Sequence, residues 1–510
     1  MVFSDLFFLF VFIPAFAILY LLAGWVDKKL LFRPDKLCYV ADDEDYGIEE
    51  QGSSQADARR GDRPGFAARN FALVIFSLLF YAWGEPVYIL LMLFCVVVNY
   101  FAGLGIAASE RYRKLALTVG LALNLCLLGT FKYLGFFGEI LGSLGLNVNV
   151  PRLALPIGIS FYIFQSISYL VDVYRRESPA QRRFMDLLLY IAMFPQLIAG
   201  PIVRYGTVAH ELHDRHVSAA DMADGIYRFL LGLGKKVILA NMLSEISTMF
   251  LADSISELSV WGAWIGIIAF TLQIYFDFSG YSDMAIGLGR CMGFHFPENF
   301  SHPYCCTTIT DFWRRWHMSL GSFFRDYAYI PLGGNRRHQA LNIFTVWFLT
   351  GMWHGASWNF IIWGLYFGLI LSIEKVTLIK WQKHIPGVLL RLYALFIVVV
   401  GWGIFYFDNF DHMKLWFSSA TGQKSLEFGF QELTSLTDNF WLWVAAILFC
   451  LPLRAWIERG AERLSCRVAG TGGAAGVMSV GRAAVSIILL ALCVALLVGA
   501  TNNAFIYTRF

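Results

Sequence analysis

The chain has 510 residues and a formal net charge of +3, with 57% hydrophobic and 15% charged residues. A soluble domain is typically about 45–50% apolar and about 25% charged. The composition therefore excludes a chain of water-soluble domains, and the absence of a basic excess argues against a nucleic-acid binder. It predicts an all-α, polytopic membrane protein. The nine cysteines include no CxxC pair, so we expect neither a disulfide framework nor a bound metal.

The first apolar run, Phe7–Trp25, predicts a retained membrane helix. It has no basic segment before it and no small-residue cleavage site after it, so it does not resemble a signal peptide. Basic residues follow it and precede the next run, and basic loops favour the cytoplasm, so the N-terminus is expected outside. Residues 41–65 carry many charges of both signs, which predicts a disordered cytoplasmic loop.

Later apolar runs predict roughly nine to twelve membrane segments, some too short to cross fully. Phe184–Val203 contains Pro195 and Pro201, which predicts a broken or re-entrant helix. The Gly- and Ala-rich piece 460–482 predicts a second cytoplasmic loop within a single membrane domain, 1–510. The remaining expected spans are Phe71–Trp83, Val87–Ala107, Leu115–Phe137, Leu155–Tyr174, Ile226–Leu251, Val260–Phe278, Ile343–His354, Phe360–Val376, Leu389–Phe407, Phe440–Leu453 and Ala483–Ala500.

A polar, aromatic segment interrupts the membrane pattern at Asp311–Tyr327. On a helix, Trp313, His317 and Phe324 would share one face. Such a helix, with aromatic and basic faces, is expected to lie in the membrane interface and to point His317 inward. The alternative is a core histidine that only forms hydrogen bonds.

A second histidine, His354, lies inside an apolar run, where an ionisable residue indicates function. Its small neighbours, including Gly351 and Gly355, leave room for a ligand or for close helix packing. A neutral imidazole can take a proton from a hydroxyl that attacks an activated acyl group. The sequence has no GxSxG or HExxH motif to favour a lipase or a zinc protease.

Two carboxylates, Asp277 and Asp283, lie among aromatic residues in an expected span. They could form ion pairs with Arg290, Arg314 or Arg315, or they could contact substrate. Arg336 and Arg337 follow a Pro-Leu-Gly-Gly-Asn turn and could bind phosphates of an anionic donor. They could equally be ordinary cytoplasmic-side charge.

These segments resemble the membrane-bound O-acyltransferase (MBOAT) superfamily and, within it, the bacterial alginate O-acetyltransferase group. The similarity is densest around the two histidines and covers nearly the whole chain. It runs through Leu155–Tyr162, Ser168–Tyr174, Phe194–Ile202, Phe276–Ile286, Phe296–Phe300, Asp311–His317, Phe324–Tyr327, Tyr329–Arg336, Trp353–Ala356 and Phe505–Phe510.

The resemblance implies a ring of tilted and re-entrant helices around a catalytic funnel in a bacterial inner membrane. It implies that His354 is catalytic and that His317 has a second role in activity. Acetyl would pass from a cytoplasmic thioester donor, acetyl-CoA, to an extracytoplasmic esterase-like partner that acetylates a polysaccharide such as alginate, with no bound cofactor. Donor or acceptor contacts are expected at Trp316, Trp353, Arg314, Arg315, Asp277, Asp283 and Arg336.

Three alternatives remain open on the sequence. Two are related enzymes, a peptidoglycan O-acetyltransferase and a component that transfers D-alanine to teichoic acid. The third belongs to another class, a transporter or flippase that uses buried ionisable residues for ion coupling.

Overall fold

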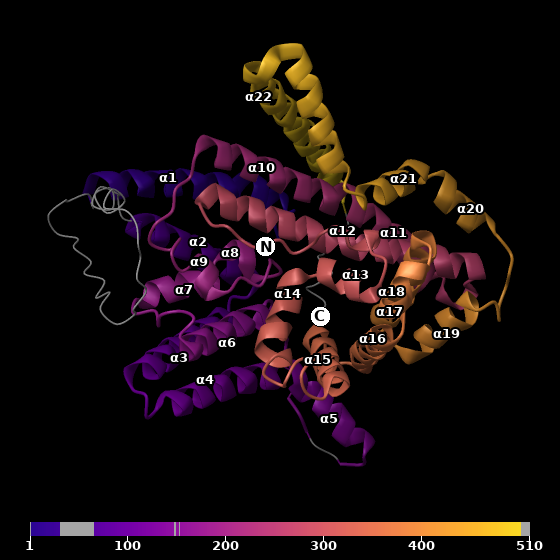
Figure 1. Cartoon of the computed structure of the whole chain (residues 1–510), viewed down its shortest axis with the longest axis horizontal. Coiled ribbons are helices and arrows are strands. Elements are labelled where there is room, and N and C mark those ends of the chain that lie inside the picture. The colour runs from indigo at the N-terminus through magenta and orange to yellow at the C-terminus, as the bar shows by residue number, and fades with distance from the viewer. Residues whose placement is uncertain (1, 31–65, 147–148, 152, 501–510) are drawn as a thin grey trace.

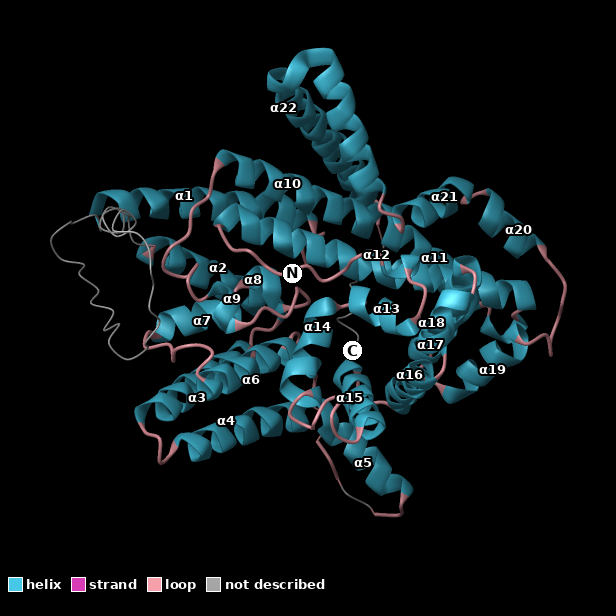
Figure 2. Ribbon diagram, viewed as in Figure 1, coloured by secondary structure: helices cyan, strands magenta, loops and turns pink. Residues whose placement is uncertain are grey.

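The computed structural model describes residues 2–30, 66–146, 149–151 and 153–500. All regular elements within these residues are helices, and no strand occurs among them (Figure 2). This confirms the all-helical prediction. The expected loop 41–65 and the C-terminal motif Phe505–Phe510 lie outside the described residues.

Twenty-two α-helices follow one another along the described chain. They are α1 Ile13–Leu30, α2 Ala67–Gly84, α3 Ile89–Ala108, α4 Arg113–Leu128, α5 Leu134–Ser143, α6 Ile159–Arg175, α7 Phe184–Ala192, α8 Phe194–Leu197, α9 Tyr205–Val208, α10 Ala219–Gly234, α11 Asn241–Thr248, α12 Val260–Met292, α13 Ile309–Arg315, α14 Met318–Phe324, α15 Gln339–His354, α16 Trp358–Val376, α17 Leu378–Trp381, α18 Gly387–Tyr406, α19 Phe410–Ala420, α20 Phe430–Thr437, α21 Phe440–Phe449 and α22 Leu453–Val498.

Short π- and 3₁₀-helical pieces extend or connect these helices. The π pieces are η1 Phe8–Phe12, η4 Gly129–Tyr133, η5 Lys235–Ala240, η6 Met249–Asp253 and η9 Arg325–Tyr329, and the 3₁₀ pieces are η7 Ile255–Glu257, η8 Pro303–Cys305 and η10 Gln382–His384.

Eight helical stretches in the described residues are long and apolar enough to cross a membrane, which supports a multi-pass membrane protein. The predicted break in Phe184–Val203 is confirmed, because α7 ends at Ala192 and α8 begins at Phe194. The eight stretches are Phe8–Lys29, Ala67–Gly84, Ile89–Ala108, Arg113–Ser143, Val260–Met292, Trp358–Val376, Gly387–Tyr406 and Met478–Val498.

The long helix α12 runs through the body of the molecule, with α10 and α11 packed along it (Figure 1). Its contact with α10 is made backbone to backbone. A Cβ atom on Gly232 would lie 2.5 Å from the carbonyl oxygen of Gly280, and one on Gly287 would lie 2.5 Å from that of Gly225. Small residues allow membrane helices to approach this closely.

Helices α14 and α15 lie near the centre of the view, between α3, α4 and α6 on one side and α16 to α18 on the other (Figure 1). Helix α15 crosses α16 at another glycine contact. A Cβ atom on Gly351 would lie 2.3 Å from the carbonyl oxygen of Phe360, and one on Gly364 would lie 2.3 Å from that of Trp347. This crossing fixes the end of α15, where His354 lies.

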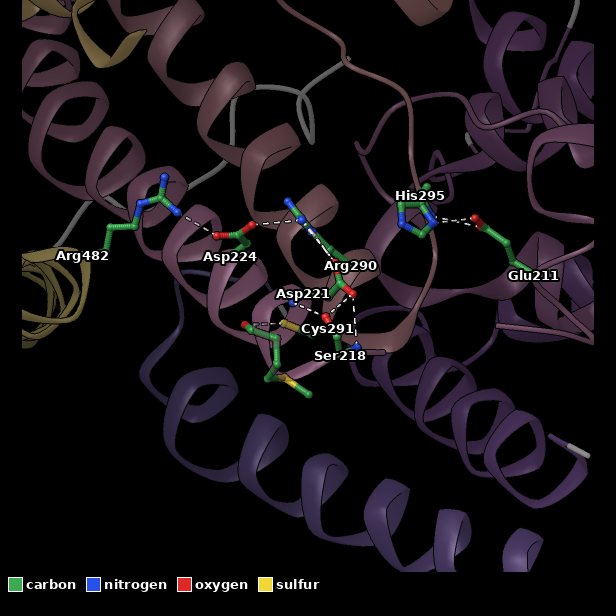
Figure 3. Close-up of polar contacts among 9 residues, drawn as sticks. Glu211, Ser218, Asp221, Asp224, Arg290, Cys291, His295 and Arg482 are labelled. Atoms are coloured by element: carbon green, nitrogen blue, oxygen red, sulfur yellow. Dashed lines mark hydrogen bonds and ion pairs between the residues drawn. The ribbon is translucent and has the colours of Figure 1, made fainter. Parts of the chain in front are cut away.

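The prediction of a loop over 460–482 is wrong, because this piece lies within α22. Its four alanines and three arginines are strong helix formers, although its six glycines disfavour a helix. Helix α22 projects from the molecule and packs against α10 (Figure 1). Arg482 holds it through Asp224, whose carboxylate lies 3.0 Å from both Arg482 and Arg290 (Figure 3).

Candidate active site

His317 lies at a break between two helices. Helix α13 ends at Arg315, Trp316 is extended, and His317 adopts a left-handed backbone conformation with φ 46° before α14 begins. The prediction of a continuous helix over Asp311–Tyr327 is therefore wrong. The expectation that His317 points inward is confirmed, because its side chain is buried.

Asn299 fixes both the break and the His317 ring. Its backbone oxygen accepts the N–H of Met318 at 3.0 Å, while its side-chain Oδ1 accepts the backbone N–H of Ser319 at 3.3 Å. A backbone N–H can only donate, so this amide atom is the oxygen. His317 Nδ1, 3.0 Å from the same oxygen, must then carry hydrogen, which leaves the lone pair on Nε2.

His354 ends α15 and is buried among aromatic rings. The ring of Trp353 contacts both imidazoles, with centroid distances of 4.9 Å to His354 and 5.7 Å to His317. The two histidines predicted from separate segments therefore share one aromatic wall. Three other rings enclose His354, with centroids at 5.0 Å for Trp363, 5.2 Å for Phe405 and 6.5 Å for Phe360.

Two residues that were not predicted from the sequence, Lys132 and Tyr133, hold the end of α15. Lys132 Nζ donates to the carbonyl of Trp353 and, at 3.2 Å, to Ser160 Oγ. The Tyr133 hydroxyl donates to the carbonyl of Met352 at 2.7 Å. The last carbonyls of a helix lack partners within it, so these two side chains cap α15 directly beside His354. The sequence feature that could have indicated this part of the site is a lysine inside an apolar run.

A cavity of about 730 Å³ lies next to His354, within the range of small-molecule sites, about 300–1,000 Å³. Gly355, Ala356 and Ser357 line it. A Cβ atom on Gly355 would lie 2.3 Å from the Phe360 ring, so Gly355 allows close packing, as Gly351 does. Lys132 also lines the cavity, and so do several uncharged polar side chains: Thr130, Ser244, Ser247, Gln273, Ser357 and Asn359.

The two carboxylates of α12 are held in ion pairs. Asp277 lies 2.6 Å from Lys236, and Asp283 lies 2.6 Å from Lys235 and 2.9 Å from Arg228. Helix α10 and its extension η5 supply all three cations because they run along α12. The structure therefore contradicts the expected pairing with Arg290, Arg314 or Arg315.

The other predicted contact residues lie in different places. Trp316 is buried among aromatic rings beside His317. Arg315 pairs with Asp311 at 2.8 Å, while Arg314 and Arg336 are exposed. None of these four residues lines the cavity next to His354.

Together, the fold and the site define a multi-pass membrane protein with two buried histidines that contact the same tryptophan. A cavity of substrate size is lined by Gly355, the residue after His354. The chain belongs to MBOAT, the membrane-bound O-acyltransferase family, whose family model matches residues 148–411. This matched region contains both histidines and Asn299. The protein is therefore an acyltransferase.

Three relatives show the range of the family around this chain. A protein of Azotobacter vinelandii named "Probable alginate O-acetylase AlgI" is 43% identical over 354 residues, covering 67% of this chain and 70% of that protein. The "Peptidoglycan O-acetyltransferase" of Helicobacter pylori is 36% identical over 378 residues, covering 66% and 71%. The "Teichoic acid D-alanyltransferase" of Bacillus subtilis is 28% identical over 241 residues, covering 44% and 60%.

Proposed function

We propose that the protein is an O-acetyltransferase that takes acetyl from cytoplasmic acetyl-CoA and delivers it across the membrane for acetylation of a cell-envelope polysaccharide such as alginate. The observation that carries this proposal is the position of His354, buried at the end of α15 in a crevice shared with Lys132, which also lines the larger, polar cavity. The printed name of the Azotobacter relative supports acetyl as the acyl group and alginate as the polymer.

In the proposed reaction, His354 acts as the general base. It takes the proton of the acceptor hydroxyl while that oxygen attacks the carbonyl carbon of the acetyl thioester. The carbon–sulfur bond then breaks, and the leaving thiolate receives the proton back from the imidazolium. His317 would be a second catalytic or donor-positioning group, with Trp353 between the two rings.

The distribution of charge supports the proposed orientation. Glu110, before α4, pairs with Arg113 and with Arg176 after α6, so two basic loops meet at one face. Helix α4 leaves this face and leads through η4 to α5, whose residues line the cavity. Because basic loops favour the cytoplasm, the cavity would open on the outside, with the N-terminus there as well.

The acceptor at this cavity would be an extracytoplasmic esterase-like partner, which passes acetyl to the polymer. Peptidoglycan is the second candidate, and the 36% identity to the Helicobacter enzyme favours it. Transfer of D-alanine has weaker support, because the Bacillus relative is 28% identical over less than half of this chain.

The test uses purified protein in detergent with labelled acetyl-CoA and, in parallel, alginate or peptidoglycan fragments with their extracytoplasmic acetyltransferases. We expect wild type to release CoA and to label one acceptor. His354→Ala should abolish release, whereas the exposed His384→Ala, a matched control, should not. Full activity of His354→Ala, or no transfer by wild type to either acceptor, would overturn the proposal.

A further inference from the structure

Lys132 is a buried lysine inside a candidate membrane span, Arg113–Ser143. Its two hydrogen-bond partners, Ser160 Oγ and the Trp353 carbonyl, are both uncharged. The other buried lysine near the site, Lys236, pairs with Asp277 at 2.6 Å, but no carboxylate in the described part of the chain pairs with Lys132. A charge is costly at this depth, so its presence calls for a function.

The local backbone conformation directs the Lys132 side chain towards the end of α15. Lys132 lies in the π-helical piece η4, which interrupts the run from α4 to α5. Single π-helical turns within α-helices are frequent at functional sites because they turn side chains away from their regular positions. Here the turn places Lys132 against the last residues of α15, one residue before His354.

Two cavities meet at Lys132. It lines the large cavity of about 730 Å³, and it also lines a crevice of about 30 Å³ with Ser160, Trp353 and His354. This space is enough for at least one water-sized group, since a water needs only about 10–15 Å³ of it. It can therefore hold a small group, such as a carbonyl oxygen, beside the lysine and the histidine that both line it.

We propose that Lys132 is a further catalytic residue, whose ammonium binds the oxygen that becomes negatively charged during acyl transfer. This inference rests on the proposed function. When the acceptor oxygen attacks, its proton goes to His354 and the electron pair of the C=O bond moves to the carbonyl oxygen. An N–H of Lys132 donates to that oxyanion until the C=O bond forms again and the thiolate leaves.

A purely structural role is the competing explanation, because Lys132 also caps α15. Tyr133 separates the two roles. It caps the same helix end through the Met352 carbonyl, but it lines neither the cavity nor the crevice. Tyr133→Phe therefore removes a cap without removing the charge.

The experiment compares kcat, KM and thermal unfolding of Lys132→Met, Lys132→Gln and Tyr133→Phe in the acetyl-transfer assay. Removing one oxyanion donor typically costs about 100- to 1,000-fold in kcat. We expect losses of that size in both lysine variants with little change in KM. The glutamine can still donate to the Trp353 carbonyl, so Lys132→Gln should fold like wild type. Tyr133→Phe should lose stability and retain most of its kcat.

Chemical rescue gives a readout that a structural role would not change. Added ethylammonium should restore turnover to Lys132→Ala, because the cavity is open to small molecules, and should not affect Tyr133→Phe. Wild-type kcat in Lys132→Gln, or equal losses in the lysine and tyrosine variants without rescue, would overturn the role of Lys132. An inactive wild type would instead overturn the proposed function.

Discussion

Helix α12 and the C-terminal half of α22 are both long enough to span a membrane, yet their surroundings differ. In α12, 78% of the most apolar window is buried and its mean hydropathy is 1.3, whereas in Met478–Val498 the values are 17% and 2.5. The less hydrophobic helix is therefore the enclosed one. Protein encloses α12 because its ionisable residues need partners, which lipid cannot supply.

The contrast between α12 and α22 indicates where the fold should tolerate substitutions. Polar side chains of α12 are matched by neighbours on α10, η5 and α11, so a substitution there leaves a group without its partner. The outer face of α22 meets few neighbours. Substitutions should therefore be costly around α12 and the active site, and nearly neutral on α22.

The largest expected effect comes from Lys236→Met, which leaves the buried carboxylate of Asp277 without its cation. Breaking a buried ion pair typically costs about 3–5 kcal/mol. Thermal and denaturant unfolding in detergent would measure this loss. The matched variant is Arg482→Met on α22, whose ion pair with Asp224 is about one-third exposed and should contribute only about 0–1 kcal/mol. Equal losses of stability in the two variants would contradict the proposed difference between α12 and α22.

A smaller loss of stability is expected from Gly351→Ala at the crossing of α15 and α16. The new methyl group would lie 2.3 Å from the Phe360 carbonyl oxygen, so the helices must separate. Overpacking of this kind costs about 1–3 kcal/mol, and a displacement of about 1 Å at a catalytic group can cost about 100-fold in rate. Unfolding and acetyl transfer should both be measured.

The control for this substitution is Gly481→Ala on α22, where the structure places nothing within 4 Å of a new Cβ. We expect wild-type stability and activity, or a slight gain in stability, because alanine favours the helix. If Gly351→Ala behaved like Gly481→Ala, α15 would not be held as tightly as the structure indicates.

Asn299→Ala should lower the rate as well as the stability, because Ser319 N–H and Oγ–H lose their acceptor too. It removes the acceptor that keeps hydrogen on Nδ1 of His317, so the ring can adopt the other tautomer. Loss of a residue that orients a metal-binding imidazole typically costs about 10–100-fold in activity, and we expect a loss of kcat of that order for this imidazole as well. The comparison is Ser282→Ala, which removes only the partner of the Asn299 amide nitrogen. Steady-state kcat distinguishes them, and equal kcat values would exclude the orienting role.

The smallest effect concerns Asp221, which caps α10 near α22 (Figure 3). Hydrogen bonds from Ser218, with a further one from Arg290, lower the pKa of Asp221 from 3.8 to about 2. Because the folded-state pKa is depressed, the stabilisation is fully present above pH 4 and is lost as pH falls towards 2. The Tm difference between wild type and Asp221→Asn should therefore be constant from pH 5 to 8 and shrink below pH 4. A difference that grows on acidification would contradict this.

The sequence was sufficient to predict both histidines as site residues, but not the contacts that position their side chains. His354 stood out because it lies in an apolar run, and His317 because it would share a helix face with aromatic residues; the structure buries both. The left-handed turn at His317 depends on Asn299, eighteen residues earlier, so local periodicity could not predict it. Lys132 was assigned to an ordinary span, Leu115–Phe137, although an ionisable residue in an apolar run indicates a functional site.

The wrong prediction for residues 460–482, in α22, has a different cause. The glycines of 460–482 indicated a loop, whereas the structure continues α22 through this piece, whose alanines and arginines favour a helix. The break in Phe184–Val203 was predictable since proline disrupts helices in a local way.

The most direct test of a membrane-crossing transfer at His354 is a sided assay in proteoliposomes of known orientation. Labelled acetyl-CoA is placed on the side of the Glu110–Arg176 ion pair, and the acceptor on the side of the cavity. We predict that label reaches the acceptor in this arrangement, is absent when the two are exchanged, and is lost in His354→Ala. Transfer that requires donor and acceptor on the same side, or that continues at the wild-type rate in His354→Ala, would contradict the account.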